Sequence, residues 1–390
     1  MAQDIDVVEV QEIEEIDYNS HLFDVIVIGA GAAGVGASIA IQHSGVENYL
    51  IVDRNGVGSS FASWPEETRF ITPSFPSNSV GMLDLNSVAV GVSPAFSMRV
   101  EHPTGKEFAE HLQNLADYFE LPLLVDTDVL GIKKREDTFY LETKEFTLKA
   151  KNVVWAGGEY QYPSHGGFPG SEFCLHTSNV SKYGDLNGED FLIIGGYESG
   201  IDAAYHLARN DKKVKVFDSN SPWGEESSDP SIALSTYSFE RMLDEKFESN
   251  VELFAQTSIS SVDYDKETYK IKTEEGQVFT SKNKPLLASG FNGSHKFVSH
   301  LFDERDDGFP SLTEQDESTT VPGVYLCGPS VRHDGHIFCF IFKYRQRFAI
   351  VAQAIASSLD LPTDEFVAAY KGWGMYLDDL SCCGQECLTC

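Results

Sequence analysis

The sequence predicts an α/β protein of two doubly wound domains, with the second domain inserted into the first. An apolar run, Val25–Ile28, leads into Gly29, Gly31 and Gly34 and then into a segment with helical periodicity. The same pattern returns at Phe191–Gly200, and it is the one internal repeat of the chain. At 390 residues the chain also exceeds what a single hydrophobic core usually organises.

The repeat divides the chain into five segments. The two apolar strand-to-glycine patterns each open a domain, and further apolar strands follow after residue 284. The expected segments are an acidic extension (1–20), the first part of the first domain (21–158), the inserted second domain (159–284), the second part of the first domain (285–375) and a cysteine-rich tail (376–390).

Composition and charge exclude several classes of function. No apolar run approaches the roughly 20 residues that span a bilayer. A formal charge of −31, from 60 acidic and 29 basic residues, repels phosphate backbones and anionic membranes, so neither nucleic acid nor a membrane is expected as a partner. The acidic first 17 residues lack the basic and apolar regions of a signal peptide, which indicates a cytoplasmic protein.

The first glycine loop has the pattern of a dinucleotide-binding site. Gly29 permits a tight turn from strand to helix, Gly31 lets the backbone approach a pyrophosphate, and Gly34 lets helix and strand pack closely. Ala33 lies in the first helical turn, whose free N–H groups and positive dipole end attract the anion. Asp53 follows the next strand and is expected to accept hydrogen bonds from a ribose.

The second glycine loop is a degenerate copy of the first. Its candidate contacts are Gly195, Gly196, Glu198, Ser199 and Gly200. Asp218 ends the following strand, where a carboxylate repels the 2′-phosphate of NADP and accepts from the 2′-hydroxyl of NAD. This favours NADH over NADPH, while the nearby Lys212, Lys213 and Lys215 leave NADPH open.

Two such loops resemble those of flavoproteins with two dinucleotide-binding domains, a superfamily that includes thioredoxin-reductase-like enzymes and flavin-containing monooxygenases. The resemblance runs from Phe23 to about Leu359 and includes Trp155–Gly158 and Leu287–Gly290, which are similar to the segments where the chain crosses between domains. It implies a Rossmann-like flavoprotein that binds FAD at the first loop and NAD(P)H at the second. Further cofactor contacts implied are Arg54, Trp64, Gly157, Gly290 and Gly328.

The resemblance does not separate two activities. Phe168–Gly170 with His176 resembles a stretched monooxygenase signature, whereas Ser60–Pro73 and His102–Gly105 are also similar to segments of bacillithiol-disulfide-reductase-like proteins. Reduced flavin could therefore pass electrons to a disulfide, or it could oxygenate a soft nucleophile.

A long helix is expected from about Phe338 to Leu359, and the resemblance directs its N-terminus to the flavin. His333 and His336, just before it, are then candidate general acids, with a solvated or core histidine as the alternative. Lys343, Arg345 and Arg347 are expected to pair with acidic residues on an exposed face of this helix, with attraction of an anionic substrate as the alternative.

The cysteines near the carboxyl end are the second source of chemistry. Cys382, Cys383, Cys387 and Cys390 are similar to the redox tails of mercuric reductase and of large thioredoxin reductases, and thiol exchange needs only accessible thiolates. Alternatively, Cys383, Cys387 and Cys390 could bind Zn, Cu(I) or an Fe–S cluster, or the tail could have no role. The isolated Cys174, Cys327 and Cys339 are expected to be small buried hydrophobes.

Together these features predict an FAD-dependent NAD(P)H oxidoreductase. Hydride passes from nicotinamide to flavin, and electrons leave to a small-molecule or thiol/disulfide substrate, with the four tail cysteines as a candidate relay. The alternatives are a flavin-dependent monooxygenase and a metal- or redox-sensing protein on the same scaffold. A homodimer is a further expectation.

Overall fold

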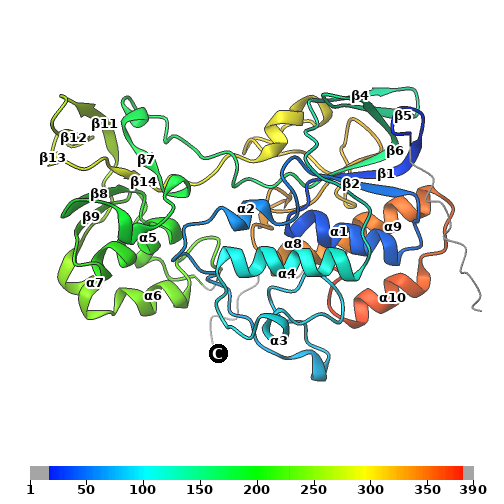
Figure 1. Ribbon diagram of the computed structural model, residues 1–390, viewed down its shortest axis with the longest axis horizontal. Coiled ribbons are helices and arrows are strands. Elements are labelled where there is room, and N and C mark those ends of the chain that lie inside the picture. Colours follow the sequence, from blue (N-terminus) through cyan, green and yellow to red (C-terminus); the bar gives the residue numbers. More distant parts are fainter. Residues whose placement is uncertain (1–16, 228, 381–390) are drawn as a thin grey trace, which may run out of the picture.

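The computed structural model describes residues 17–227 and 229–380 of the chain. Figure 1 shows two lobes, with the second domain, drawn in green, on one side and the first domain on the other. Segments that are far apart in the sequence form the first domain, because both the blue N-terminal elements and the orange C-terminal helices lie in it.

The first domain is built on a seven-stranded sheet in the order β3-β2-β1-β6-β5-β4, with β15 paired to β6. Its strands are β1 (Leu22–Ile28), β2 (Tyr49–Val52), β3 (Leu123–Leu124), β4 (Gly131–Arg135), β5 (Thr138–Glu142), β6 (Thr147–Trp155) and β15 (Val324–Leu326). One edge of β6 pairs along its length with β1. Its other edge is shared, because β5 pairs with Thr147–Ala150 and β15 pairs with Val153–Trp155.

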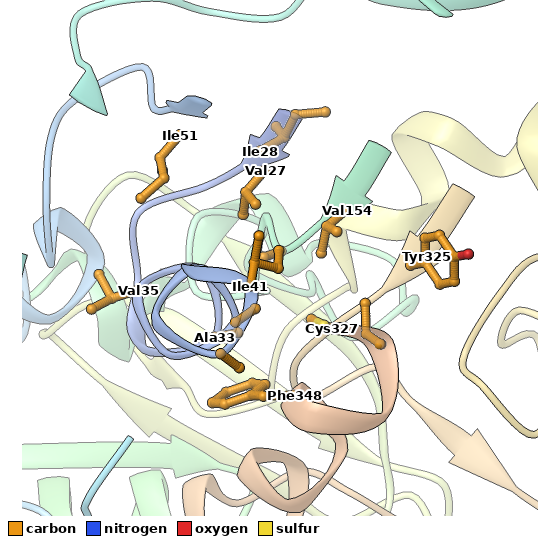
Figure 2. Close-up of a cluster of buried hydrophobic side chains, with 14 of the residues drawn as sticks. Val27, Ile28, Ala33, Val35, Ile41, Ile51, Val154, Tyr325, Cys327 and Phe348 are labelled. Atoms are coloured by element: carbon orange, nitrogen blue, oxygen red, sulfur yellow. The ribbon is translucent and has the colours of Figure 1, made fainter. Parts of the chain in front are cut away.

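Helices cover this sheet, and α1 (Ala32–His43) packs against α9 (Phe348–Ser358). A Cβ on Gly36 of α1 would lie 2.2 Å from the Phe348 ring, so glycine lets the two helices touch. Figure 2 shows Phe348 against one side of α1, while Val27 and Val154 of the sheet lie on the opposite side of that helix. The remaining helices are α2 (Ser59–Ala62), α3 (Pro94–Met98), α4 (Gly105–Tyr118), α8 (Ile341–Tyr344) and α10 (Asp364–Gly372).

The second domain has a five-stranded parallel sheet in the order β10-β9-β8-β14-β7. The strands are β7 (Leu175–His176), β8 (Asp190–Ile194), β9 (Lys213–Phe217), β10 (Val251–Phe254) and β14 (Leu286–Leu287), with helices α5 (Glu198–Arg209), α6 (Thr236–Met242) and α7 (Glu245–Asn250). An antiparallel meander of β11 (Ile259–Tyr264), β12 (Tyr269–Thr273) and β13 (Val278–Ser281) adjoins it.

Short elements complete the described chain. The 3₁₀ turns are η1 (Asn78–Val80), η2 (Ser171–Phe173), η3 (Thr177–Asn179), η4 (Tyr183–Asp185), η5 (Pro222–Gly224), η6 (Ser294–Leu301) and η7 (Arg345–Arg347), and a two-stranded hairpin joins β16 (Arg332–His333) to β17 (His336–Ile337). Among the described residues, no helix has both the length and the apolar character required to cross a bilayer.

The predicted fold class is confirmed, with two corrections of detail. Leu286 and Leu287 belong to the second sheet, so that domain continues past the predicted boundary at residue 284. The helix predicted from Phe338 to Leu359 begins only at Ile341, and it is divided into α8, η7 and α9.

The predicted exposure of Arg345 and Arg347 is also wrong, since both side chains are buried. Arg345 donates to the carbonyls of Asp84 and Ser87, and Arg347 donates to the Asp316 carboxylate. The break at η7 coincides with these two guanidinium groups, which are turned into the protein toward their partners. Lys343 does pair with an acid, Asp229 of the second domain.

His111 of α4 gives a prediction about pH. Its ring is buried, Nδ1 lies 2.9 Å from the Ser97 hydroxyl, and burial lowers its pKa to about 4. The unfolded chain, with a histidine pKa of about 6.5, therefore takes up a proton before the folded chain does. Because of His111, we expect the free energy of unfolding to fall by up to about 1.4 kcal/mol per pH unit as the pH falls from about 6.5 to 4. The measurement is urea unfolding at several pH values. The free energy of unfolding should fall less steeply with pH in His111→Leu than in the unchanged protein, and an identical slope in the two proteins would contradict the prediction.

Candidate active site

A cavity of about 710 Å³ brings the two glycine loops together. Gly29 and Gly31 line it from the first domain, and Glu198 and Ser199 line it from the second. Ligand sites commonly have volumes of about 300–1,000 Å³ and lie between domains. The cavity therefore has the size and position of a cofactor and substrate site.

The first loop has the geometry that the sequence predicted. Gly29 has φ +106°, and a Cβ there would lie 2.4 Å from the Ala156 carbonyl oxygen, so the turn requires glycine. A Cβ on Gly34 would lie 1.7 Å from the Gly29 carbonyl oxygen. At Gly31, by contrast, a Cβ would meet no atom within 4 Å, which leaves this backbone open to the cavity.

Asp53 holds the loop from the end of β2. Its Oδ2 accepts from the backbone N–H of Ala30 at 2.8 Å, and its Oδ1 accepts from those of Asn55 and Gly56 at 2.8 Å. A carboxylate has about four lone-pair sites, so one remains for a ribose hydroxyl. No side chain caps α1, whose first N–H groups have no intrahelical partner. The open Gly31, the free N–H groups and Asp53 together fit a dinucleotide pyrophosphate and ribose.

The second loop has the same backbone turn and the same pattern of hydrogen bonds to a carboxylate. Gly195 has φ +98°, and its Cβ would lie 2.3 Å from the Ala288 carbonyl oxygen. Asp218 accepts from the N–H of Gly196 at 2.7 Å and from those of Asn220 and Ser221 at 2.8 and 2.7 Å. The carboxylates of Asp53 and Asp218 therefore occupy equivalent positions, as the sequence predicted.

One position differs between the loops. The residue that precedes α1 is Gly31 (φ −80°, ψ −168°), and the residue that precedes α5 is Tyr197 (φ −82°, ψ −166°). The two backbones coincide, so the Tyr197 side chain leaves the chain where Gly31 has only open space. Gly196, which the sequence analysis counted as a contact, is instead packed under the Trp223 ring, 2.3 Å from the position of a Cβ.

The structure separates the predicted cofactor contacts into two groups. One group lines the cavity: Gly29, Gly31, Ala33, Asp53, Arg54, Trp64, Gly157, Glu198, Ser199 and Gly290. The other group is not part of its lining: Gly34, Gly195, Gly196, Gly200, Asp218 and Gly328. Glu198 has its carboxylate turned to α6, where it accepts from Ser235 N–H at 2.6 Å and Ser238 Oγ at 2.5 Å, and burial raises its pKa.

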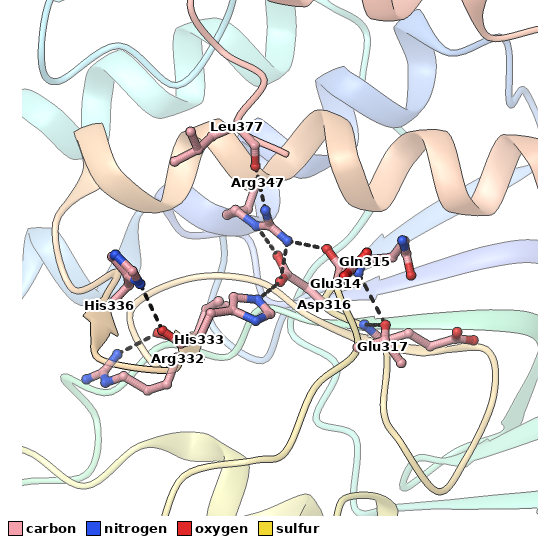
Figure 3. A network of polar contacts seen from close by, with 11 residues as sticks. Glu314, Gln315, Asp316, Glu317, Arg332, His333, His336, Arg347 and Leu377 are labelled. Atoms are coloured by element: carbon pink, nitrogen blue, oxygen red, sulfur yellow. Dashed lines mark hydrogen bonds and ion pairs between the residues drawn. The ribbon is translucent and has the colours of Figure 1, made fainter. Parts of the chain in front are cut away.

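The two histidines that were candidate general acids lie outside the lining of the cavity. His333 and His336 lie in the β16–β17 hairpin, which precedes α8 as expected, but neither side chain lines the cavity. Figure 3 shows His333 directed to Asp316, at 2.5 Å, and His336 directed to the His333 carbonyl, at 3.1 Å. This arrangement does not favour acid catalysis by either ring in the cavity.

Two cavity residues were missed. Glu159 follows the crossing segment Trp155–Gly158, and burial raises its pKa although Arg332 opposes that shift. Cys339 was expected to be a buried hydrophobe, but its Sγ lies at the cavity wall, 3.0 Å from Ser231 Oγ. Burial raises the pKa of this thiol. Only its position next to the predicted helix start could have indicated Cys339 in advance.

The four tail cysteines, Cys382, Cys383, Cys387 and Cys390, lie outside the described residues, as does the metal site that three of them could form. The described chain ends beside η7, where Leu377 N–H donates to Gln346 and Arg347 donates to the Leu377 carbonyl. Among the described residues, no cluster of histidine, cysteine and carboxylate side chains could hold a metal ion.

Known proteins share this architecture. The family model described as pyridine nucleotide-disulphide oxidoreductase matches residues 26–328. An uncharacterized CzcO-like oxidoreductase of Geobacillus kaustophilus is 27% identical over 194 residues, which are 49% of this chain and 53% of that protein. The chain thus spans about half the length of this relative.

Two further comparisons cover more of the chain. Bacilliredoxin reductase Bdr of Bacillus subtilis is 23% identical over 313 residues, which are 78% of this chain and 88% of that protein. The solved structure of bacillithiol disulfide reductase Bdr (YpdA) from Staphylococcus aureus superposes with a TM-score of 0.70 at 19% identity, over 86% of this chain and 99% of that one. At this identity, the structural likeness establishes the fold alone.

Proposed function

Because the chain belongs to the pyridine nucleotide-disulphide oxidoreductase family, we propose that it oxidises NADH through bound FAD and reduces a disulfide substrate by way of its C-terminal cysteines. The observation that carries the proposal is the single cavity that both dinucleotide loops line. The coarser activity, an FAD-dependent pyridine nucleotide oxidoreductase, follows from the family. We add to it the identity of the electron donor, NADH, and of the electron acceptor, a disulfide.

The first domain supplies the FAD site. The open backbone at Gly31 and the free N–H groups that begin α1 would hold the pyrophosphate, and Asp53 would hold the ribose. Bound FAD would supply hydride acceptance from nicotinamide and two-electron transfer to a second substrate. The protein's part is to orient both dinucleotides in one cavity and to keep the reaction away from bulk water.

Asp218 supports NADH as the donor. Its carboxylate is fixed by three backbone N–H groups, so it cannot turn away from an incoming 2′-phosphate. Lys212 and Lys213, which could have offset this charge, bond instead to Gly188, Ser249 and Asn250. Lys215 pairs with Glu252. These lysines are therefore engaged elsewhere, which supports discrimination against NADPH.

Two observations support a disulfide acceptor that is reached through the tail. Of the proteins to which the chain is similar, one is named bacilliredoxin reductase and another is named bacillithiol disulfide reductase. Within the described chain, Cys174, Cys327 and Cys339 are all free, so no cysteine pair lies beside the cavity. Electrons that pass from the flavin to a disulfide substrate would then need another pair of thiols.

The end of the described chain contacts the segment that follows α8, a helix that lines the cavity. Tyr344 lines the cavity, and Arg347, one helical turn later, bonds to the Leu377 carbonyl. Ten residues follow Leu380, and an extended chain covers about 3.3–3.6 Å per residue, so they could reach on the order of 35 Å. The overall reaction is balanced: NADH, a proton and a disulfide give NAD⁺ and two thiols.

An anaerobic titration tests the proposal. The flavin-loaded protein is titrated with NADH and, separately, with NADPH, and the electrons taken up per flavin are counted from the absorbance. We expect NADH to be the better reductant and the uptake to be four electrons or more, two for the flavin and two for each tail disulfide. In a variant with Cys382, Cys383, Cys387 and Cys390 all replaced by serine, we expect an uptake of two electrons.

The control is Cys174→Ser, which removes a described cysteine outside the cavity wall and should leave the uptake at four or more. An uptake of two electrons in the unchanged protein would rule out the tail as a relay. NADH oxidation coupled to oxygen uptake, unaffected by the four serines, would identify a monooxygenase instead. Failure of either nucleotide to reduce the flavin would contradict the whole proposal.

A further inference from the structure

Tyr197 occupies the place in the second dinucleotide loop that Gly31 occupies in the first. We propose that Tyr197 closes the nicotinamide-dinucleotide site, and that the dinucleotide binds only when the tyrosine and the segment Asp229–Ser235 above it move aside. The inference rests on the proposed function for the identity of the dinucleotide. The contacts that close the site are made by this chain's own residues.

The backbone geometry gives the direction of the side chain. The φ and ψ angles of Gly31 and Tyr197 differ by 2° each, so a Cβ leaves both loops in the same direction relative to the following helix. At Gly31 that direction is free of atoms for 4 Å. The middle position of such a loop is where the backbone approaches a pyrophosphate, and a side chain there stands in its way.

The tyrosine is held in place at its far end. Its hydroxyl donates to the Pro230 carbonyl and lies 3.2 Å from that of Ala233. The neighbouring Glu198 carboxylate accepts from Ser235 N–H at 2.6 Å. Tyr197 and Glu198 thus fasten the segment Asp229–Ser235 against the start of α5, where the pyrophosphate would bind.

The first domain fastens the same segment from its other side. Lys343 Nζ lies 2.6 Å from Asp229 Oδ1 and 2.8 Å from Ser231 Oγ, and Cys339 Sγ lies 3.0 Å from Ser231 Oγ. Lys343 belongs to α8, whose Ile341 and Tyr344 line the cavity. Opening the second loop therefore requires contacts between the domains to break, which links access of the dinucleotide to the state of the first domain.

Equilibrium binding of NAD⁺ tests the closure without turnover. The oxidised, flavin-loaded protein is titrated with NAD⁺ by calorimetry, and the unchanged protein is compared with Tyr197→Gly. The apparent Kd equals the intrinsic Kd divided by the open fraction, so a site that is open for about a tenth of the time or less should tighten about tenfold or more when the side chain is removed. Tyr197→Phe keeps the ring but loses its anchor, and we expect an intermediate Kd.

Two further variants locate the effect. Adding Asp218→Ala to Tyr197→Gly should abolish the gain, which shows that the tighter binding is at the second loop. Lys343→Gln loosens the segment from the first domain, and we expect it to lower the Kd several-fold while Tyr197 stays in place. An unchanged or raised Kd for NAD⁺ in Tyr197→Gly overturns the proposal, as does a gain that survives Asp218→Ala.

The same proteins separate this inference from the proposed function. If Tyr197→Gly binds NAD⁺ more tightly but neither NADH nor NADPH reduces the flavin, the closure stands and the oxidoreductase function fails. If NADH reduces the flavin of the unchanged protein but Tyr197→Gly binds NAD⁺ no more tightly, the function stands and the closure fails.

Discussion

Replacing Asp53 with alanine is expected to leave the protein almost without flavin. The carboxylate accepts hydrogen bonds from three backbone N–H groups that shape the first loop, and it is the group available to the ribose. A hydrogen bond to a charged group contributes about 1.5–3 kcal/mol, so the loss of several should raise the Kd for FAD by a factor of 100 or more. The measurement is the flavin-to-protein absorbance ratio after gel filtration, followed by titration with FAD.

Asp218→Ala is the matched control, because Asp218 makes the same three kinds of bond in the second loop. We expect this variant to keep its flavin and to lose reduction by NADH. If Asp53→Ala retained a full complement of flavin, or if Asp218→Ala lost it, the assignment of FAD to the first loop would be wrong.

Asp316→Asn is expected to lower the free energy of unfolding by about 3–5 kcal/mol. The side chain of Asp316 is 0% exposed and that of Arg347 is 2% exposed, and the guanidinium bonds to both carboxylate oxygens at 2.9 Å. His333 shares the same carboxylate (Figure 3). Removing the negative charge leaves a buried arginine without compensation, whereas asparagine still tolerates the φ of +59° at this position.

Denaturant unfolding with flavin content held constant measures the effect. Lys133→Met is the comparison, since it removes an ion pair whose partners are 61% and 47% exposed, and it should cost no more than about 1 kcal/mol. The double replacement Asp316→Asn/Arg347→Met should recover part of the loss because neither of the two paired positions then carries a charge. If Asp316→Asn lowered the free energy of unfolding no more than Lys133→Met does, the contacts of Asp316 with His333 and Arg347 would not be what holds the β16–β17 hairpin to η7.

The features that the sequence predicted correctly are local ones. Strand, glycine turn and helix follow one another within Leu22–His43 and again within Asp190–Arg209, so short-range periodicity and the demands of the turn define them. Asp53 and Asp218 could be predicted because each ends the strand that pairs beside its loop. In both domains these local patterns were sufficient to locate the dinucleotide loops.

The features that could not be predicted depend on partners far away in the chain. Arg345 and Arg347 were expected in solvent because isolated arginines avoid the interior, but Asp84, Ser87 and Asp316 supply their partners there. Cys339 and Glu159 reach the cavity only because the two domains meet. The degenerate second loop was noted in the sequence, but the importance of Tyr197 emerges only when its backbone is compared with that of Gly31.

The shared edge of β6 has a consequence for synthesis of the protein on the ribosome. Thr147–Ala150 can pair with β5 as soon as they emerge, but Val153–Trp155 must wait for Val324–Leu326, after the whole inserted domain has been made. At about 5–20 residues per second, that delay is roughly ten seconds or more. During this time the inserted domain can fold by itself. The backbone groups on one edge of Val153–Trp155, beside the first glycine loop, are still unpaired. Cofactor loading is therefore expected to be a late event, after the chain nears completion.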